Sequence, residues 1–220
     1  MINTGAGKTA NHPVQTVSWF DVVKWCNAKS QKEALIPCYY TNTAQTTVYK
    51  TGQVNVANTM VKWSASGYRL PTEAEWEKAA RGGLSARRFP WGDVITHSLA
   101  NYVSDATYAY DISPTRNFHP TYGTGAEPYT SPVGSFAPNA YGLYDMAGNV
   151  WEWCWDWYEG AYSSTSPSAN PLGPVSGSVR VLRGGSWYGL ASYSRVSYRF
   201  RSVPSDWYYF IGFRLARGPL

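Results

Sequence analysis

The chain of 220 residues has few charges, few cysteines and no long apolar run. Only 15% of its residues are charged, whereas 44% are hydrophobic and 16% aromatic, which excludes a disordered chain. No apolar run approaches the roughly 18 residues of a membrane helix, so we expect no membrane span. The first ten residues show no basic segment followed by an apolar one, so no signal peptide is visible.

Cysteine and histidine are too sparse to predict a metal centre by themselves. Three cysteines leave at least one thiol unpaired within the chain, and no Cys-x-x-Cys pair suggests structural zinc. The three histidines are scattered through irregular sequence, where an isolated histidine is more often a surface residue than a ligand. These residues are Cys26, Cys38, Cys154, His12, His97 and His119.

Basic residues gather near the C-terminus, and all of those are arginine. Residues 171–220 hold seven Arg and one Asp, whereas residues 1–170 hold 12 basic and 13 acidic residues. No lysine follows Lys78. Arginine without lysine is typical of bidentate hydrogen bonding to carboxylates and carbonyls rather than of a phosphate-binding patch. We therefore expect no nucleic-acid partner, despite a net charge of +5.

Two segments have the periodicity and the caps of α-helices. Residues 19–29 carry apolar side chains at helical spacing and follow Ser18, a favoured N-cap. Residues 73–81 follow Thr72, with Glu75 placed to complete a capping box and a Gly-Gly pair placed to end the helix.

The rest of the sequence predicts short strands and long loops. Tryptophan alternates with other residues over 151–157, and strand-like runs occupy 179–182 and 210–215. Residues 84–140 read as loop, and a loop this long needs something to hold it, bound metal ions being one candidate. We predict a single α+β domain over residues 1–220, with its helices segregated from a small sheet.

Four blocks, in this order, resemble the family of the formylglycine-generating enzyme, also called sulfatase-modifying factor. The resemblance extends over about residues 11–217 and implies a C-type-lectin-like fold with few short strands and many loops. The blocks are residues 13–19 (PVQTVSW), 68–77 (YRLPTEAEWE), 148–153 (GNVWEW), and 183–187 (RGGSW) with 211–214 (IGFR).

The third block predicts a structural calcium site. Asp145 and Glu152 bracket a turn whose Gly148 and Val150 carbonyls can point inward, and calcium takes carboxylate and carbonyl oxygens. Members of the family bind calcium at the matching positions, so the resemblance implies the same here. A salt bridge or a plain turn is the alternative. A second, weaker calcium site would begin at Asn101, but its downstream acidic partner does not match cleanly.

The residues that make the family's enzymes catalytic are missing. Those enzymes oxidise a substrate cysteine with a copper-binding cysteine pair shortly after the Gly-Gly-Ser motif, because Cu(I) prefers sulfur ligands. Residues 186–195 contain no cysteine, and none follows Cys154. The related sulfoxide synthases use a three-histidine iron site, which the histidines here do not match. We expect a protein that is not an enzyme. The alternative is a member of this superfamily with an unassigned oxidative activity.

The C-terminal segment resembles the variable proteins of diversity-generating retroelements, some of which use this scaffold. There, adenines of Asn codons are altered, which yields Tyr, Ser, Asp, Gly, Phe, Leu, Ile or Val. Residues 187–213 hold 10 aromatic residues among 27 and no Asn. The candidate variable, ligand-binding positions are Tyr188, Gly189, Leu190, Tyr193, Ser194, Tyr198, Ser202, Asp206, Trp207, Tyr208, Tyr209 and Phe210.

This resemblance implies a binding protein whose ligand, a protein or another macromolecule, contacts the C-terminal segment. Tyrosine, tryptophan, serine and glycine are also the residues that binding loops favour. The candidate side chains should then face solvent as one aromatic patch, with Arg195, Arg199 and Arg201 alternating between them. If the aromatics instead fill a core, each should be nearly fully buried. We expect a monomer at the cell surface, outside the cell or on a phage particle.

Overall fold

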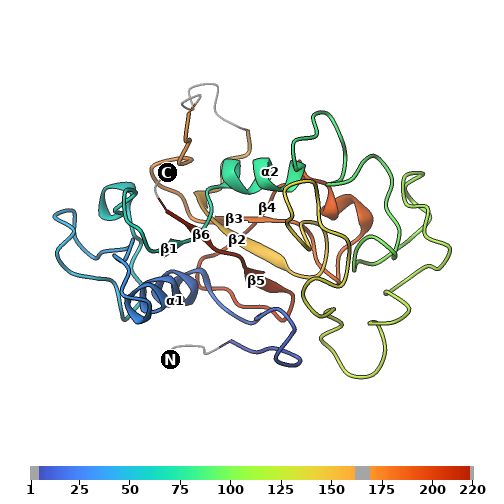
Figure 1. Ribbon diagram of the computed structural model, residues 1–220, viewed down its shortest axis with the longest axis horizontal. Coiled ribbons are helices and arrows are strands. Elements are labelled where there is room, and N and C mark those ends of the chain that lie inside the picture. Colours follow the sequence, from blue (N-terminus) through green and yellow to red (C-terminus); the bar gives the residue numbers. More distant parts are fainter. Residues whose placement is uncertain (1–4, 162–168, 219–220) are drawn as a thin grey trace.

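Two α-helices, two short 3-10 helices (Asn58–Met60 and Ala191–Ser194) and two small sheets make up the regular structure of the computed structural model, which describes residues 5–161 and 169–218 (Figure 1). Helix α1 spans Trp19–Lys32, and α2 spans Glu73–Arg81. Within those residues no helix could cross a membrane, since α1 has 14 residues and α2 has nine. The architecture is α+β and rich in loops, as the sequence predicts.

Both helices begin at the predicted caps. The Ser18 side chain accepts a hydrogen bond from the Asp21 backbone N–H, and the Asp21 carboxylate accepts one from the Ser18 N–H. Thr72 and Glu75 form the same reciprocal pair at α2, which ends at Gly82 in the left-handed conformation, with φ at 55°. Helix α1 continues three residues past its predicted end, because no glycine or proline interrupts it there.

The larger sheet has four strands in the order β4-β3-β2-β5. The central strand, β2, pairs antiparallel with β3 and parallel with β5, while β4 lies antiparallel along the outer side of β3. The smaller sheet is the antiparallel pair β1 and β6. The strands are β1 Tyr68–Arg69, β2 Trp151–Trp157, β3 Arg180–Arg183, β4 Phe200–Ser202, β5 Ile211–Phe213 and β6 Ala216–Arg217.

Strand β2 is buried on both faces, and its tryptophans alternate with other residues because successive side chains point to opposite faces. Trp153 and Trp155 belong to the main core, together with residues of α1. Cys154 points to the other face and packs with Trp76 of α2 and Val181 of β3. The strand therefore separates two apolar clusters, and α2 covers the second one.

A buried carboxylate holds part of the long loop of residues 84–140. Asp111 is 3% exposed and accepts hydrogen bonds from the Tyr102 hydroxyl at 2.6 Å and the Ser104 hydroxyl at 3.0 Å. The backbone N–H groups of Asp105 and Ser113 also point to it. These contacts satisfy a carboxylate in the interior and restrain a segment that has little regular structure.

Candidate binding surface

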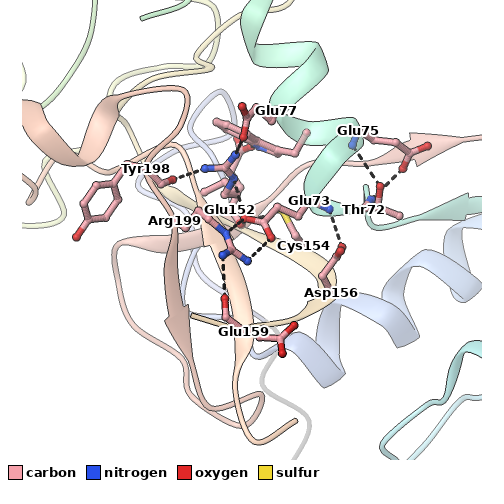
Figure 2. A network of polar contacts seen from close by, with 12 residues as sticks. Thr72, Glu73, Glu75, Glu77, Glu152, Cys154, Asp156, Glu159, Tyr198 and Arg199 are labelled. Atoms are coloured by element: carbon pink, nitrogen blue, oxygen red, sulfur yellow. Dashed lines mark hydrogen bonds and ion pairs between the residues drawn. The ribbon is translucent and has the colours of Figure 1, made fainter. Parts of the chain in front are cut away.

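Two arginines tie the predicted binding segment to α2 (Figure 2). Arg199 forms a bidentate ion pair with Glu73, with Nε 2.6 Å from Oε1 and Nη2 2.8 Å from Oε2. Arg183, at the end of β3, donates to the Glu77 carboxylate and to the Tyr198 backbone carbonyl. Arg183 is fully buried. Its contacts and those of Arg199 hold the backbone between the two arginines against α2.

A third arginine anchors the end of the segment to β2. Arg214 Nη2 lies 2.7 Å from Glu152 Oε1, and Arg214 Nε donates to Oε2 of the same carboxylate. The indole N–H of Trp76 donates to Glu152 Oε2 at 2.6 Å. Buried charges are tolerated when they are paired and hydrogen-bonded in this way. The framework of the segment is therefore held by ion pairs, as its arginine-rich composition suggested.

Five of the candidate aromatic side chains are exposed to solvent, and Phe200 of the same segment is 42% exposed as well. Trp207 is 57% exposed, Tyr188 52%, Tyr208 45%, and Tyr193 and Tyr209 37% each. The alternative in which these aromatics fill a core required each to be nearly fully buried, and the structure excludes it for all five. A group of exposed aromatic rings on a folded protein is typical of an interaction surface.

Ring contacts join four of these five aromatics, all but Trp207, to two clusters among the described residues. In the first, the Phe210 cluster, Phe210 stacks on Tyr188 with centroids 5.7 Å apart and on Tyr208 at 5.3 Å, and Tyr209 meets it edge-on. The other, the Trp151 cluster, places Tyr193, Tyr198 and Phe200 against the ring of buried Trp151. The clusters adjoin, because the Trp151 N–H donates to the Phe210 carbonyl at 2.8 Å.

Two of the predicted surface residues are buried, and for these the prediction of solvent exposure is wrong. The Gly189 carbonyl accepts a hydrogen bond from the Val103 N–H at 2.8 Å, which packs this turn against the long loop. Ser194 is 0% exposed, and its Oγ would lie 2.8 Å from a Cβ at Gly185. The partly exposed members of the set are Leu190, Tyr198, Ser202, Asp206 and Phe210.

Around β4, Arg199 and Arg201 alternate with the aromatics as predicted, whereas Arg195 does not, because its guanidinium carbon lies 5.6 Å from the Tyr198 ring centroid. The guanidinium carbons of Arg199 and Arg201 lie 4.9 Å and 4.7 Å from the centroid of the Tyr158 ring. Tyr198 and Phe200 instead contact the Trp151 ring, at 6.1 Å and 5.1 Å. Side chains of an extended backbone point to opposite sides in turn, which separates the two kinds of residue.

Loop residues that sequence reasoning missed also join this surface. Phe118 contacts the ring of Tyr188 at 6.3 Å, and Tyr129 contacts the buried ring of Trp187 at 5.1 Å. Both lie in the long loop of residues 84–140, about 60 to 70 positions before their partners. No local pattern could have signalled these contacts, because only the tertiary fold brings the loop to the segment.

The four residues of the predicted calcium site line one cavity of about 550 Å³. Asp145 Oδ2 accepts a hydrogen bond from the Gly134 N–H at 2.7 Å, whereas its buried Oδ1 has no partner among the described residues. Burial raises the pKa of this carboxyl. A buried carboxylate oxygen without a hydrogen-bond partner, such as Asp145 Oδ1, is a suitable ligand for a cation. Glu152 fits less well, because Arg214 and Trp76 already engage both of its oxygens. Calcium here stays a prediction.

Asn101, proposed to begin the weaker calcium site, has another role in the structure. Its side-chain amide donates to the Tyr129 carbonyl at 2.8 Å, and its backbone carbonyl accepts from the Asn149 N–H at 2.8 Å. The same carbonyl would lie 2.3 Å from a Cβ at Gly148. Asn101 therefore ties the long loop to the Gly-Asn-Val-Trp-Glu block.

All three thiols lie in the interior. Cys26 and Cys154 are 0% exposed and Cys38 is 1% exposed. Burial raises the pKa of the Cys38 thiol to about 11 and raises those of the other two as well. Reactive cysteines need the opposite environment, exposed and electropositive. Within residues 5–161 and 169–218, no three His, Cys, Asp or Glu side chains are grouped so as to hold a metal ion.

Known proteins are similar to this chain in sequence and in fold. The chain is 42% identical to the formylglycine-generating enzyme of Streptomyces coelicolor over 165 residues, which cover 74% of this chain and 50% of that protein. It is 36% identical to the Thermomonospora curvata formylglycine-generating enzyme over 218 residues, 96% of this chain and 57% of the other. The chain spans about half the length of the curated relatives it matches.

Among solved structures, the Treponema denticola variable protein 1 superposes with a TM-score of 0.76 and 35% sequence identity, covering 100% of this chain and 76% of that one. The family described as the sulfatase-modifying factor enzyme 1-like domain matches residues 3–219. These matches cover both helices, both sheets and all four sequence blocks. The chain belongs to the sulfatase-modifying factor enzyme 1-like family.

Proposed function

We propose that this chain is a non-catalytic ligand-binding protein and that residues 187–213 form a diversified binding surface. The observation that carries the proposal is the exposure of five candidate aromatics on a segment whose backbone is anchored by ion pairs to the buried carboxylates of Glu73 and Glu152. Rigid aromatic side chains give contact area at low cost in conformational entropy. A fixed framework beneath them allows side chains to vary without loss of the fold.

The similarity to a variable protein supports the same proposal. The relative from Treponema denticola is named a variable protein, and the match covers the whole length of this chain. Tyr188, Tyr193, Tyr208 and Tyr209 are exposed and reachable from Asn codons, and exposed Trp207 can be supplied by an altered Arg codon. Sequencing the neighbouring DNA provides one test. We expect a near-copy of the codons for residues 183–217, with Asn at the candidate positions, beside a reverse transcriptase gene.

A stability measurement tests the proposal on the protein itself. Replacing Tyr193, Tyr208 and Tyr209 together with serine should lower the free energy of unfolding by about 1 kcal/mol or less for each site. Tyr49→Ser is the matched control, because this tyrosine is 0% exposed and its loss should cost about 3–5 kcal/mol. Collapse of the triple variant would show that the segment is core and would end the proposal.

An oxidative enzyme remains the second candidate, because the curated relatives include formylglycine-generating enzymes. Incubation with a cysteine-containing sulfatase-type peptide, copper and oxygen would reveal such an activity as an aldehyde product. The buried thiols predict no product above background. Turnover that persists after repurification would replace the binding proposal with the enzymatic one.

A further inference from the structure

A hollow of about 660 Å³ lies beside β4, next to the Trp151 cluster. Its lining consists of Tyr158, which follows β2, and of every residue from Arg195 to Arg201 except Val196. It thus contains three arginines and two tyrosines. Ser197 adds an exposed hydroxyl.

The three guanidinium groups differ in how they are used. Arg199 is committed to the framework through Glu73, and it also donates to the Glu159 backbone carbonyl at 2.8 Å (Figure 2). Arg195 donates its Nε–H to the Ser192 carbonyl at 2.8 Å. Neither Arg195 nor Arg201 has a carboxylate partner within residues 5–161 and 169–218.

Aromatic rings position the two uncommitted guanidinium groups. The Arg201 guanidinium carbon lies 4.7 Å from the Tyr158 centroid, and that of Arg195 lies 5.6 Å from the Tyr198 centroid. A cation over an aromatic face is attracted to it, which restricts a long side chain while leaving its N–H groups available. The nearby acidic residue of the segment, Asp206, is engaged by the Ser202 hydroxyl and the Val203 N–H.

We propose that this hollow, whose lining includes both Arg195 and Arg201, binds an oxyanion group of the ligand, a carboxylate, sulfate or phosphate, through these two guanidinium groups. The guanidinium fork matches the geometry of such groups with two parallel hydrogen bonds. The inference rests on the proposed function, because it gives one end of the binding surface a chemical preference. The aromatic clusters would supply contact area, while the arginine pair would select ligands that carry an acidic group.

The test is a titration of the full chain, with 15N-labelled arginine, against inorganic phosphate, sulfate and acetate at constant ionic strength. The Nε–H signals of Arg195 and Arg201 should shift saturably with one shared dissociation constant. Arg217 is the internal control, since it is exposed and stacked on Tyr68 but lies on β6. The anion that binds most tightly would identify the source, a carboxylate, a sulfate or a phosphate. If Arg217 shifts with the same constant, the hollow has no selectivity and the proposal is wrong.

Variants separate the fork geometry from bare charge. The double substitution Arg195→Gln and Arg201→Gln should weaken binding of the best anion at least about tenfold, whereas Arg217→Gln should leave it unchanged. Replacing both residues with lysine keeps the charge but removes the fork, and several-fold weaker binding is expected. Wild-type affinity in the lysine pair would overturn the proposal. Such a failure would leave the proposed function standing if the triple tyrosine variant stays folded.

Discussion

Arg199 and Glu73 are 126 positions apart in the sequence, yet their side chains form a bidentate ion pair with contacts of 2.6 and 2.8 Å. Glu73 is the first residue of α2, and its side chain is only 2% exposed. Arg183 is its other basic neighbour, with Nε 3.4 Å from Oε1. This contact fixes the start of β4 relative to the helix and so positions the aromatic residues on either side.

Arg199→Ala should therefore destabilise the protein more than Arg201→Ala. Removing one partner of a buried ion pair costs about 3–5 kcal/mol, but Arg183 remains near Glu73, so we expect about 2–3 kcal/mol. Among the described residues, Arg201 contacts the Tyr158 ring and no carboxylate, so its loss should cost about 1 kcal/mol or less. Urea unfolding of both variants measures the difference. Equal losses would mean that the ion pair does not anchor the segment.

Asp156 should make the stability depend on pH. Burial and the nearby Glu73 charge together raise the pKa of this carboxyl to about 7, against the lowering effect of the Glu73 N–H, which donates to Asp156 at 2.6 Å. Between about pH 4 and pH 7 the native state thus binds more protons than the unfolded chain. The free energy of unfolding should fall as the pH rises through this range, on the order of 1–4 kcal/mol in total.

Asp156→Asn isolates this contribution, because the amide oxygen can still accept the Glu73 hydrogen bond. Urea unfolding at several pH values should show the variant gaining stability relative to wild type from about pH 4 to pH 7. Burial lowers the pKa values of His97 and His119, which opposes the trend at acidic pH but is common to both proteins. A difference that does not change with pH would contradict a raised pKa at Asp156.

Tyr193 and Ser194 are neighbours in a short 3-10 helix, Ala191–Ser194. Substitution should destabilise the protein much less at Tyr193 than at Ser194. Tyr193→Ser removes a partly exposed ring and should cost about 1 kcal/mol or less. Ser194→Tyr forces a ring into the space beside Gly185 and should cost about 1–3 kcal/mol or more. Thermal unfolding of the two variants checks this. If Ser194→Tyr is tolerated, position 194 can vary after all.

Added calcium should raise the melting temperature of the protein, with Asp145 as a ligand of the ion. A ligand that binds only the native state at about 100 times its dissociation constant adds about 2.7 kcal/mol to the free energy of unfolding. Asp145→Ala should abolish the response, because it removes the unpartnered Oδ1. Magnesium is the control, since it demands stricter octahedral geometry. An unchanged melting temperature in calcium and in chelator would exclude the site.

The amino-acid sequence by itself determined the local structure. Helix starts at Ser18 and Thr72 follow from side chains that satisfy backbone N–H groups a few residues away. The alternating tryptophans of 151–157 indicated either one face of a strand or an aromatic core, since side-chain direction alternates along an extended chain, and the structure shows a strand there. The sequence blocks also predicted the family, because their order and length are specific.

Only the tertiary structure decided which C-terminal residues face solvent. Tyr193 and Ser194 are both reachable from an Asn codon, yet one ring is exposed and the other side chain is buried against Gly185. Long-range neighbours fix that difference, as they also fix the pairing of Arg199 with Glu73 and the position of Arg201 over the Tyr158 ring. Burial and charge pairing depend on what packs against a residue, and no local pattern in the sequence records it.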